Sequence, residues 1–178
     1  MPYSIQNFSN ESEVASRFKQ DWGEGVYPMR EGRLPSFYTN GMKYIGAIDS
    51  QRKIAGVTGY IDKGSYFIIG GTFTHPDYQR GGKKHKKEGS PFSKLKNYRE
   101  GIVEGKPKIA GFRRTSGTDK DLEDWISGNK KIFNLEEHED IPQDMIDNFK
   151  QRYGDAWGIR KNFYYYVDDG WFDIIRLG

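Results

Sequence analysis

A segment with the composition of a buried strand runs directly into a glycine-rich turn at residues 66–84, and this segment constrains the fold most. Residues 66–74 are mainly aromatic, β-branched or glycine, as in a buried strand. Pro76 ends the strand because it removes a backbone donor and fixes φ. Asp77 favours a turn, and Gly81-Gly82 permit the positive φ angles at which consecutive N–H groups face one concavity. The sequence therefore predicts an anion-binding turn directly after a strand.

The charge pattern around this turn favours a phosphate ligand. Residues 83–87 read Lys-Lys-His-Lys-Lys, so four lysines follow the glycines at once. From Arg80 to Arg114 there are twelve Lys and Arg against three Glu, whereas the whole chain carries a net charge of only +3. From Asp119 to Asp147 three Lys stand against ten acidic residues. A basic flank of this kind suits a ligand with several phosphates, and nucleic acid would suit it too.

Residues 74–84, Thr-His-Pro-Asp-Tyr-Gln-Arg-Gly-Gly-Lys-Lys, resemble motif A of the GNAT superfamily of N-acetyltransferases. In that family the strand binds the pantetheine arm of acetyl-CoA and the loop amides bind its pyrophosphate. The resemblance implies that the arm is lined by Thr72, Phe73 and Thr74, and that the pyrophosphate is bound by Gln79, Arg80, Gly81, Gly82, Lys83 and Lys84. Lys83 and Lys84 depart from the usual aliphatic and small residues. We therefore expect a longer, more basic loop, with the next helix beginning at about Ser90-Pro91.

The segments before this loop predict strands and one capped helix. Strands are expected at residues 3–8, 42–48 and 54–61, the last two joined by a hairpin loop at 49–53. Asn10 is a typical helix N-cap, and the apolar residues at helical spacing after it, expected to be buried, are Val14, Phe18 and Trp22.

The segments after the loop predict a strand, helix, strand unit. In the helix after Pro91, an apolar face is expected from Phe92, Leu95, Tyr98 and Ile102. A strand at 108–115 follows, and such a crossover makes the strands at 66–74 and 108–115 parallel. Further elements are expected as a helix with Leu122, Trp125 and Ile126, a strand at 132–135, a helix with Met145, Phe149 and Tyr153, and a hairpin of 163–167 with 171–176.

The expected fold is mixed α/β. By resemblance it is a GNAT-like, mostly antiparallel twisted sheet flanked by helices, with its fourth and fifth strands parallel and splayed apart. Residues 1–178 are expected to form one acyltransferase domain. Only 35% of the residues are apolar, but twelve Tyr, eleven Phe and four Trp favour an aromatic core.

The resemblance implies transfer of an acetyl group from acetyl-CoA to a primary amine, but it does not supply the catalytic residues. The tyrosine that protonates the departing thiolate in the family has no counterpart, and the nearest residue is Trp125, which cannot serve as a proton source near neutral pH. Ile68 stands where some family members have a glutamate base. The acidic segment, with Glu136, Glu137, His138 and Glu139, could instead attract a cationic amine. The catalytic residues, the acceptor and the oligomeric state stay unassigned.

Composition excludes several other classes. With no cysteine, thiolate catalysis and disulfides are excluded, and the three histidines are too far apart in sequence for a metal motif. No apolar run is long enough for a membrane span and no signal peptide is indicated, so a cytoplasmic protein is expected. Two alternatives stay open. One is a GNAT-like protein without catalysis, and the other is a nucleic-acid-binding module that uses Lys83–Lys96 with Tyr78, Phe92 and Tyr98 interleaved.

Overall fold

The computed structural model describes residues 3–29 and 40–113 and several short stretches nearer the C-terminus, which are residues 143–144, 147, 158–160, 163–168 and 171–176. The chain divides into two compact units. Unit 1 comprises Met1–Ile61 and Gly70–Ile102, and unit 2 comprises Asp62–Ile69 and Val103–Gly178. Each unit is described by itself. The expectation of one domain over residues 1–178 stays a prediction.

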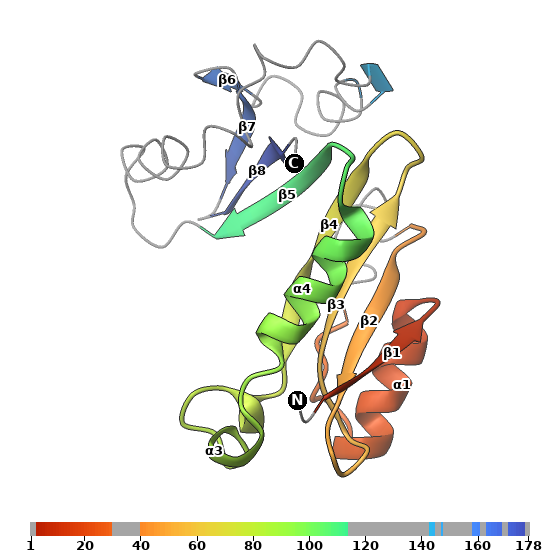
Figure 1. Cartoon of the computed structure of the whole chain (residues 1–178), viewed down its shortest axis with the longest axis vertical. Coiled ribbons are helices and arrows are strands. Elements are labelled where there is room, and N and C mark those ends of the chain that lie inside the picture. Colours follow the sequence, from red (N-terminus) through yellow and green to blue (C-terminus); the bar gives the residue numbers. More distant parts are fainter. Residues whose placement is uncertain are drawn as a thin grey trace. The chain divides into compact units, whose positions relative to one another are not determined.

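Unit 1 contains four neighbouring strands, of which the last three in chain order are joined by short turns (Figure 1). Its strands are β1 (Ser4–Phe8), β2 (Lys43–Ile48), β3 (Ile54–Asp62) and β4 (Phe67–Thr74), of which Asp62 and Phe67–Ile69 are counted in unit 2. β1 pairs antiparallel with β2, β2 pairs antiparallel with β3, and β3 lies between β2 and β4. The strands expected at 3–8, 42–48, 54–61 and 66–74 are thus confirmed to within a residue or two at their ends.

Helix α1 (Glu11–Trp22) begins where the sequence predicts. The Asn10 side chain accepts a hydrogen bond from the Glu13 amide at 3.0 Å, and the Glu13 carboxylate accepts one from the Ser9 amide at 2.8 Å. These reciprocal bonds satisfy donors that a helix N-terminus otherwise leaves open. Val14 and Phe18 are fully buried, as expected for the apolar face.

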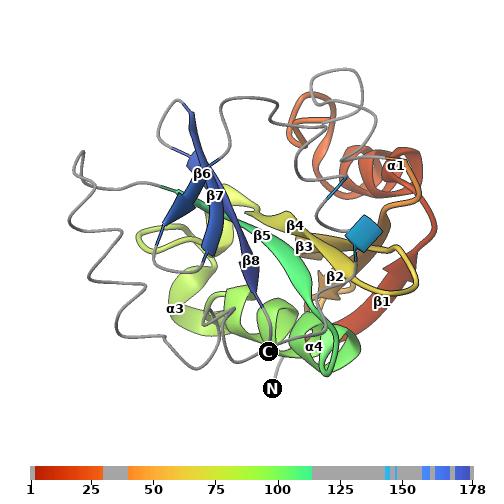
Figure 2. The same cartoon turned by 90° about the horizontal axis from the view of Figure 1, so that it is seen from above.

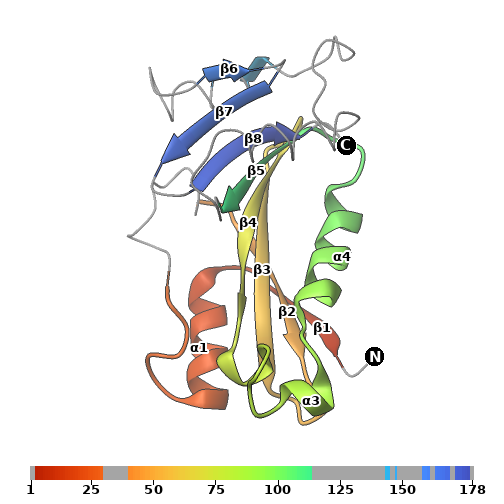
Figure 3. The ribbon, with the colours of Figure 1, turned by 90° about the vertical axis from the view of Figure 1, so that its left-hand side faces the viewer.

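Two helices cover opposite faces of the unit 1 sheet (Figure 3). On the α1 side, the Phe73 ring packs edge-on against Phe18, with ring centroids 5.4 Å apart. The other face carries α4 (Phe92–Val103), whose Leu95 is fully buried. Gly56 of β3 lets α4 come close, because a Cβ there would lie only 3.2 Å from Leu95. The apolar side chains of both faces thus form the core of this unit.

The expected apolar face of α4 is wrong in three of its four residues. Phe92, Tyr98 and Ile102 are 47%, 41% and 37% exposed, and only Leu95 of the expected set is buried. The buried line instead runs through Leu95, Arg99 and Val103, each four residues from the last. It includes an arginine, because the Arg99 guanidinium finds acceptors on the sheet, which apolar spacing alone does not reveal.

A pair of alanine substitutions in α4 tests this assignment. We expect Leu95→Ala to lower the free energy of unfolding by about 2–5 kcal/mol, because it empties a buried site. Phe92→Ala should change it by roughly 0.5 kcal/mol or less, because the ring is half exposed. Urea unfolding of both variants measures the difference. Equal losses would contradict the buried line described above.

Unit 2 contains the first residues of β4 and four further strands, β5 (Lys108–Arg113), β6 (Gly158–Arg160), β7 (Phe163–Asp168) and β8 (Trp171–Arg176). β4 pairs parallel with β5 at Phe67↔Lys108 and Ile68↔Ile109, the ladder recorded among the described residues. The remaining order is β5-β8-β7-β6, all antiparallel (Figure 2). The expected C-terminal hairpin is confirmed as β7 and β8, whereas β6 was not predicted.

The fold class is confirmed as mixed α/β. A mostly antiparallel set of strands with β4 parallel to β5 is flanked by helices, in the element order that the GNAT resemblance implies. Within the described ranges no helix has the length and apolar character needed to cross a membrane. The elements expected around Trp125 and at 132–135 lie outside the described residues, and of the helix expected with Met145, Phe149 and Tyr153 only residues 143–144 and 147 are described, as helix.

Candidate functional site

The candidate site begins where β4 ends in unit 1. The strand stops at Thr74, and the His75 amide still bonds the Ala55 carbonyl of β3 at 2.8 Å. Pro76–Tyr78 then forms a single 3₁₀ turn, η1. The His75 imidazole Nδ1 accepts a hydrogen bond from the Asp77 amide at 3.1 Å and so caps this turn. The predicted stop at Pro76 is confirmed, and it directs the chain into the loop of residues 79–84.

The two glycines of the loop serve different purposes. Gly81 has φ +89°, a conformation that side chains rarely adopt. Gly82 does not have a positive φ, which corrects the expectation for it. A Cβ at Gly82 would instead collide with the carbonyl oxygens of Pro76 and Asp77. Glycine is therefore required at 81 for conformation and at 82 for space.

Backbone hydrogen bonds close this loop on itself. The Gly82 amide donates to the Gln79 carbonyl at 2.8 Å, and the Lys84 amide donates to the Asp77 carbonyl at 2.8 Å. The amides of Gly82 and Lys84 are therefore engaged within the loop, and the predicted role of these two residues in binding the pyrophosphate stays a prediction. The Gln79 amide donates to the Pro76 carbonyl at 3.1 Å, and within the described part of the chain the amides of Arg80, Gly81 and Lys83 make no hydrogen bond. We call these three N–H groups the open amides.

The predicted arm-lining residues lie at the end of β4. Thr72 donates its hydroxyl to Thr58 Oγ1 at 3.0 Å. The Phe73 ring packs edge-on against Tyr27, with ring centroids 5.5 Å apart. The Thr74 carbonyl accepts a bond from the Gln79 side chain at 2.8 Å, which ties the strand end to the loop. The predicted set is thus contiguous in space, and its role in binding a cofactor stays a prediction.

The loop lysines differ in their surroundings. The Lys84 ammonium lies 2.8 Å from Gln51 Oε1 and 3.5 Å from Asp49 Oδ2. It also stands 5.3 Å from the centre of the Trp22 ring, within reach of a cation–π contact. Lys83 is exposed and makes no ion pair with the described residues. Lys84 is therefore turned into the protein, and Lys83 stays available to a ligand.

Asp49 is a buried carboxylate that the sequence did not single out. Its side chain is fully buried, and Tyr78 donates its hydroxyl to Oδ2 in a short hydrogen bond. Oδ1 accepts the amides of Gln51 and Lys53, both at 2.8 Å. Burial alone would raise the pKa of Asp49, but the hydrogen bonds from Tyr78, Lys53 and Gln51 and the Lys84 charge hold it below its usual value. An aspartate in a hairpin turn gives no sequence signal of burial.

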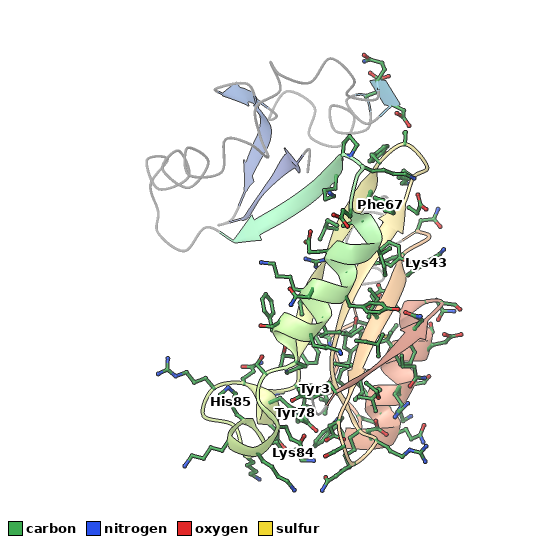
Figure 4. All side chains as sticks on the ribbon, in the orientation of Figure 1. Tyr3, Lys43, Phe67, Tyr78, Lys84 and His85 are labelled. Carbon is green, nitrogen blue, oxygen red and sulfur yellow. The ribbon has the colours of Figure 1, made fainter. Side chains whose placement is uncertain are left out.

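The pKa of Tyr78, the partner of Asp49, is shifted in the opposite direction. Burial is the main cause that raises the pKa of Tyr78, and its bond to Asp49 raises it further. Figure 4 shows Tyr78 and Lys84 beside Tyr3 at the end of the unit that carries α3 (His85–Glu88). This short helix was not predicted. Tyr78 is therefore a permanent hydrogen-bond donor near neutral pH, and the Asp49 carboxylate is its permanent acceptor.

His75 is held in an apolar stack beside the loop. Its ring lies 3.9 Å from the Trp22 ring, centre to centre. Burial lowers the pKa of His75, and the Lys84 and Lys53 charges lower it further against the opposing effect of Asp77. A neutral imidazole fits its observed role as acceptor of the Asp77 amide.

Arg99 is not available to a ligand in the way that its basic neighbours are. Its Nη1 donates to Thr58 Oγ1 at 2.9 Å and to the Gly70 carbonyl at 3.0 Å, and the residue is buried on the side of α4 that faces the sheet. By contrast, no carboxylate of the described residues lies within 4 Å of six cations in residues 80–96, which are Arg80, Lys83, Lys86, Lys87, Lys94 and Lys96. Ile68, in place of the family's glutamate, is fully buried in β4.

Comparison with known proteins gives distant structural similarities. No family model and no curated protein sequence matches the chain. The ribosomal-protein-S18-alanine N-acetyltransferase from Escherichia coli is 12% identical, with 98% of this chain and 93% of that chain covered and a TM-score of 0.45. PaiA N-acetyltransferase from Thermoplasma acidophilum, solved in complex with coenzyme A, is 14% identical, with 100% of each chain covered and a TM-score of 0.42.

A third similar structure names the family that residues 74–84 resemble. It is an acetyltransferase of the GNAT family from Staphylococcus aureus Mu50, 12% identical, with 98% of this chain and 100% of that chain covered and a TM-score of 0.37. The three proteins are distant structural similarities, and at these identities and TM-scores they carry no argument about the activity of this chain. Any proposed function therefore has to be argued from the contacts of the loop.

The low pKa of Asp49 predicts how stability responds to acid. Because the pKa of Asp49 in the folded protein lies below its ordinary value of 3.8, the stabilisation by Asp49 is complete above that pH and is lost as the pH falls through the folded pKa. Asp49→Asn cannot titrate there. We expect the free energy of unfolding of the variant to fall less steeply than that of the wild type below pH 3.8. Urea unfolding over a pH series measures both slopes, and identical slopes would contradict the assignment.

Proposed function

We propose that the chain is an acetyl-CoA-dependent N-acyltransferase that transfers an acetyl group to a primary amine. The observation that carries the proposal is the set of open amides, Arg80, Gly81 and Lys83, in a basic loop directly after β4. Backbone N–H groups in such a loop are good ligands for a diphosphate, and the exposed cations around them add favourable charge. The resemblance at residues 74–84 points to the same ligand.

The residues of the chain fit the diphosphate part of this cosubstrate. The open amides would bind its oxygens, and the Arg80 and Lys83 side chains would neutralise part of its charge. Acetyl transfer forms an amide bond and breaks the thioester C–S bond, so a fixed donor is needed for the carbonyl oxygen. We propose a backbone N–H near Phe73 for that donor and assign no acid or base. Glu136, Glu137, His138 and Glu139 lie outside the described residues.

The amine acceptor and the oligomeric state stay unassigned, and the cytoplasmic location stays a prediction from the sequence. A primary amine on a protein, a tRNA-like molecule, an aminoglycoside or a polyamine would each be compatible with the acidic segment at 119–147. A panel of such amines with acetyl-CoA identifies the acceptor. Absence of turnover with every amine, in a chain that still binds acetyl-CoA, would favour the alternative of a GNAT-like protein without catalysis.

Substitution of Gly82 tests the proposal. We expect a saturating concentration of acetyl-CoA to raise the melting temperature of the wild type, because a ligand at 100 times its Kd adds about 2.7 kcal/mol of stability. Gly82→Ala should abolish this shift, because a methyl group there collides with the Pro76 and Asp77 carbonyls and displaces the loop. The measurement is thermal unfolding with and without acetyl-CoA.

Gly101→Ala is the matched control for that substitution. Gly101 lies in α4, and a Cβ there meets no atom within 4 Å. The variant should keep the full acetyl-CoA shift. A wild type without any shift, or a Gly82→Ala variant with the wild-type shift, would rule the proposed binding mode out.

A second candidate function rests on exposed aromatic rings among the cations. Phe92 and Tyr98 are 47% and 41% exposed on α4, near Lys94 and Lys96, and such rings can stack on nucleic-acid bases. Tyr78, which the nucleic-acid alternative also used, is fully buried and cannot contribute. Binding of single-stranded RNA that weakens steeply with salt would favour this function, whereas an acetyl-CoA shift without RNA affinity would favour the acyltransferase.

A further inference from the structure

Three consecutive residues of the turn between β2 and β3 bind the segment that contains the loop. Asp49 accepts the Tyr78 hydroxyl, Ser50 donates to Glu88 Oε1 at 2.9 Å, and Gln51 accepts the Lys84 ammonium at 2.8 Å. The residues in each pair stand 29, 38 and 33 positions apart in sequence. The turn at residues 49–51 therefore holds the segment from Tyr78 to Glu88 in place through side-chain hydrogen bonds.

The two oxygens of Asp49 divide their partners between the two segments. Oδ1 accepts the Gln51 and Lys53 amides and so fixes its own turn. Oδ2 faces the other segment, where it accepts Tyr78 and lies 3.5 Å from the Lys84 ammonium. A buried carboxylate is costly unless donors fill its oxygens. Because the donors come from both segments, displacing either segment leaves the buried Asp49 carboxylate without part of its hydrogen bonds.

Tyr78 and Lys84 stand on either side of the open amides. Both side chains reach the same Asp49 oxygen, so the two ends of the stretch at 79–83 are held at a fixed separation. Since the Lys84 ammonium is engaged by Asp49 and Gln51, it is not free to act as the main phosphate ligand. The open amides are thus held in place by contacts that they do not make themselves.

We propose that Asp49 is a positioning residue for the diphosphate site, acting through Tyr78 and Lys84. This inference rests on the proposed function, because it concerns the same loop. The contact keeps the open amides in the geometry that binds a diphosphate, so that binding does not have to order the loop. Lys84 then contributes as a tether, and the direct cationic ligands are Arg80 and Lys83.

The test compares a ligand that has the diphosphate with one that lacks it. Tyr78→Phe removes the hydroxyl but keeps the ring, which packs 5.9 Å from Trp22 and 6.2 Å from Tyr3, centre to centre. We expect the Kd for CoA to rise roughly tenfold, as for loss of a hydrogen bond to a charged group. The affinity for pantetheine, which has no phosphate, should stay at its wild-type value. Calorimetric titration well below the melting temperature measures both.

Two further variants make the result specific. Ser12→Ala removes a hydroxyl from an exposed residue of α1 outside the site and should leave both affinities unchanged. Asp49→Asn should weaken CoA binding, and the double variant with Tyr78→Phe should lose no more than the larger single loss, because both changes act on one contact. If Tyr78→Phe does not fold, Lys84→Met supplies the same comparison from the other end of the loop.

Each outcome supports or overturns the inference. Unchanged CoA affinity in Tyr78→Phe and Asp49→Asn overturns it. Equal weakening of CoA and pantetheine, or additive losses in the double variant, also overturns it, because those results indicate a general structural defect. Failure of the wild type to bind CoA overturns the proposed function itself. Selective, non-additive loss of CoA affinity supports the positioning role.

Discussion

The contact between the Asp49 carboxylate and the Tyr78 hydroxyl is the constraint on which the candidate site depends. A charged group without exposed surface remains in a fold only where hydrogen bonds replace the water it has lost. Here the replacement comes from the Gln51 and Lys53 amides on one oxygen and from Tyr78 and Lys84 on the other. The buried charge is therefore tolerated only when the hairpin and the loop are packed together so that donors from both reach the carboxylate.

That arrangement accounts for the chemistry available in the loop. Gly82 packs against the carbonyls of Pro76 and Asp77, and the Gly82 and Lys84 amides are used to close the loop. The open amides are therefore what the loop can offer to an anion, and exposed Lys and Arg side chains surround them. A diphosphate needs several fixed donors and a favourable potential, which is why the proposed function assigns the diphosphate to this loop.

Local signals in the sequence predict most of the described fold, because they act over a few residues. The cap at Asn10, the hairpin loop at 49–53 and the stop at Pro76 each depend on neighbouring residues. Two features depend on partners far away in sequence, namely the hydrogen bond of the buried Asp49 to Tyr78 and the hydrogen bonds of Arg99 to Thr58 and Gly70, which displaced the expected apolar face of α4. The crowding at Gly82 comes from the nearby carbonyls of Pro76 and Asp77, and the sequence does not distinguish this need for space from a need for positive φ.

Amide chemical shifts during titration with acetyl-CoA test the central claim most directly. If the open amides bind the diphosphate, the largest shifts in the loop will come from Arg80, Gly81 and Lys83. The amides of Gly82 and Lys84, which already donate to Gln79 and Asp77, will move less. Shifts concentrated in other parts of the chain, with the three open amides unchanged at saturation, would contradict the account.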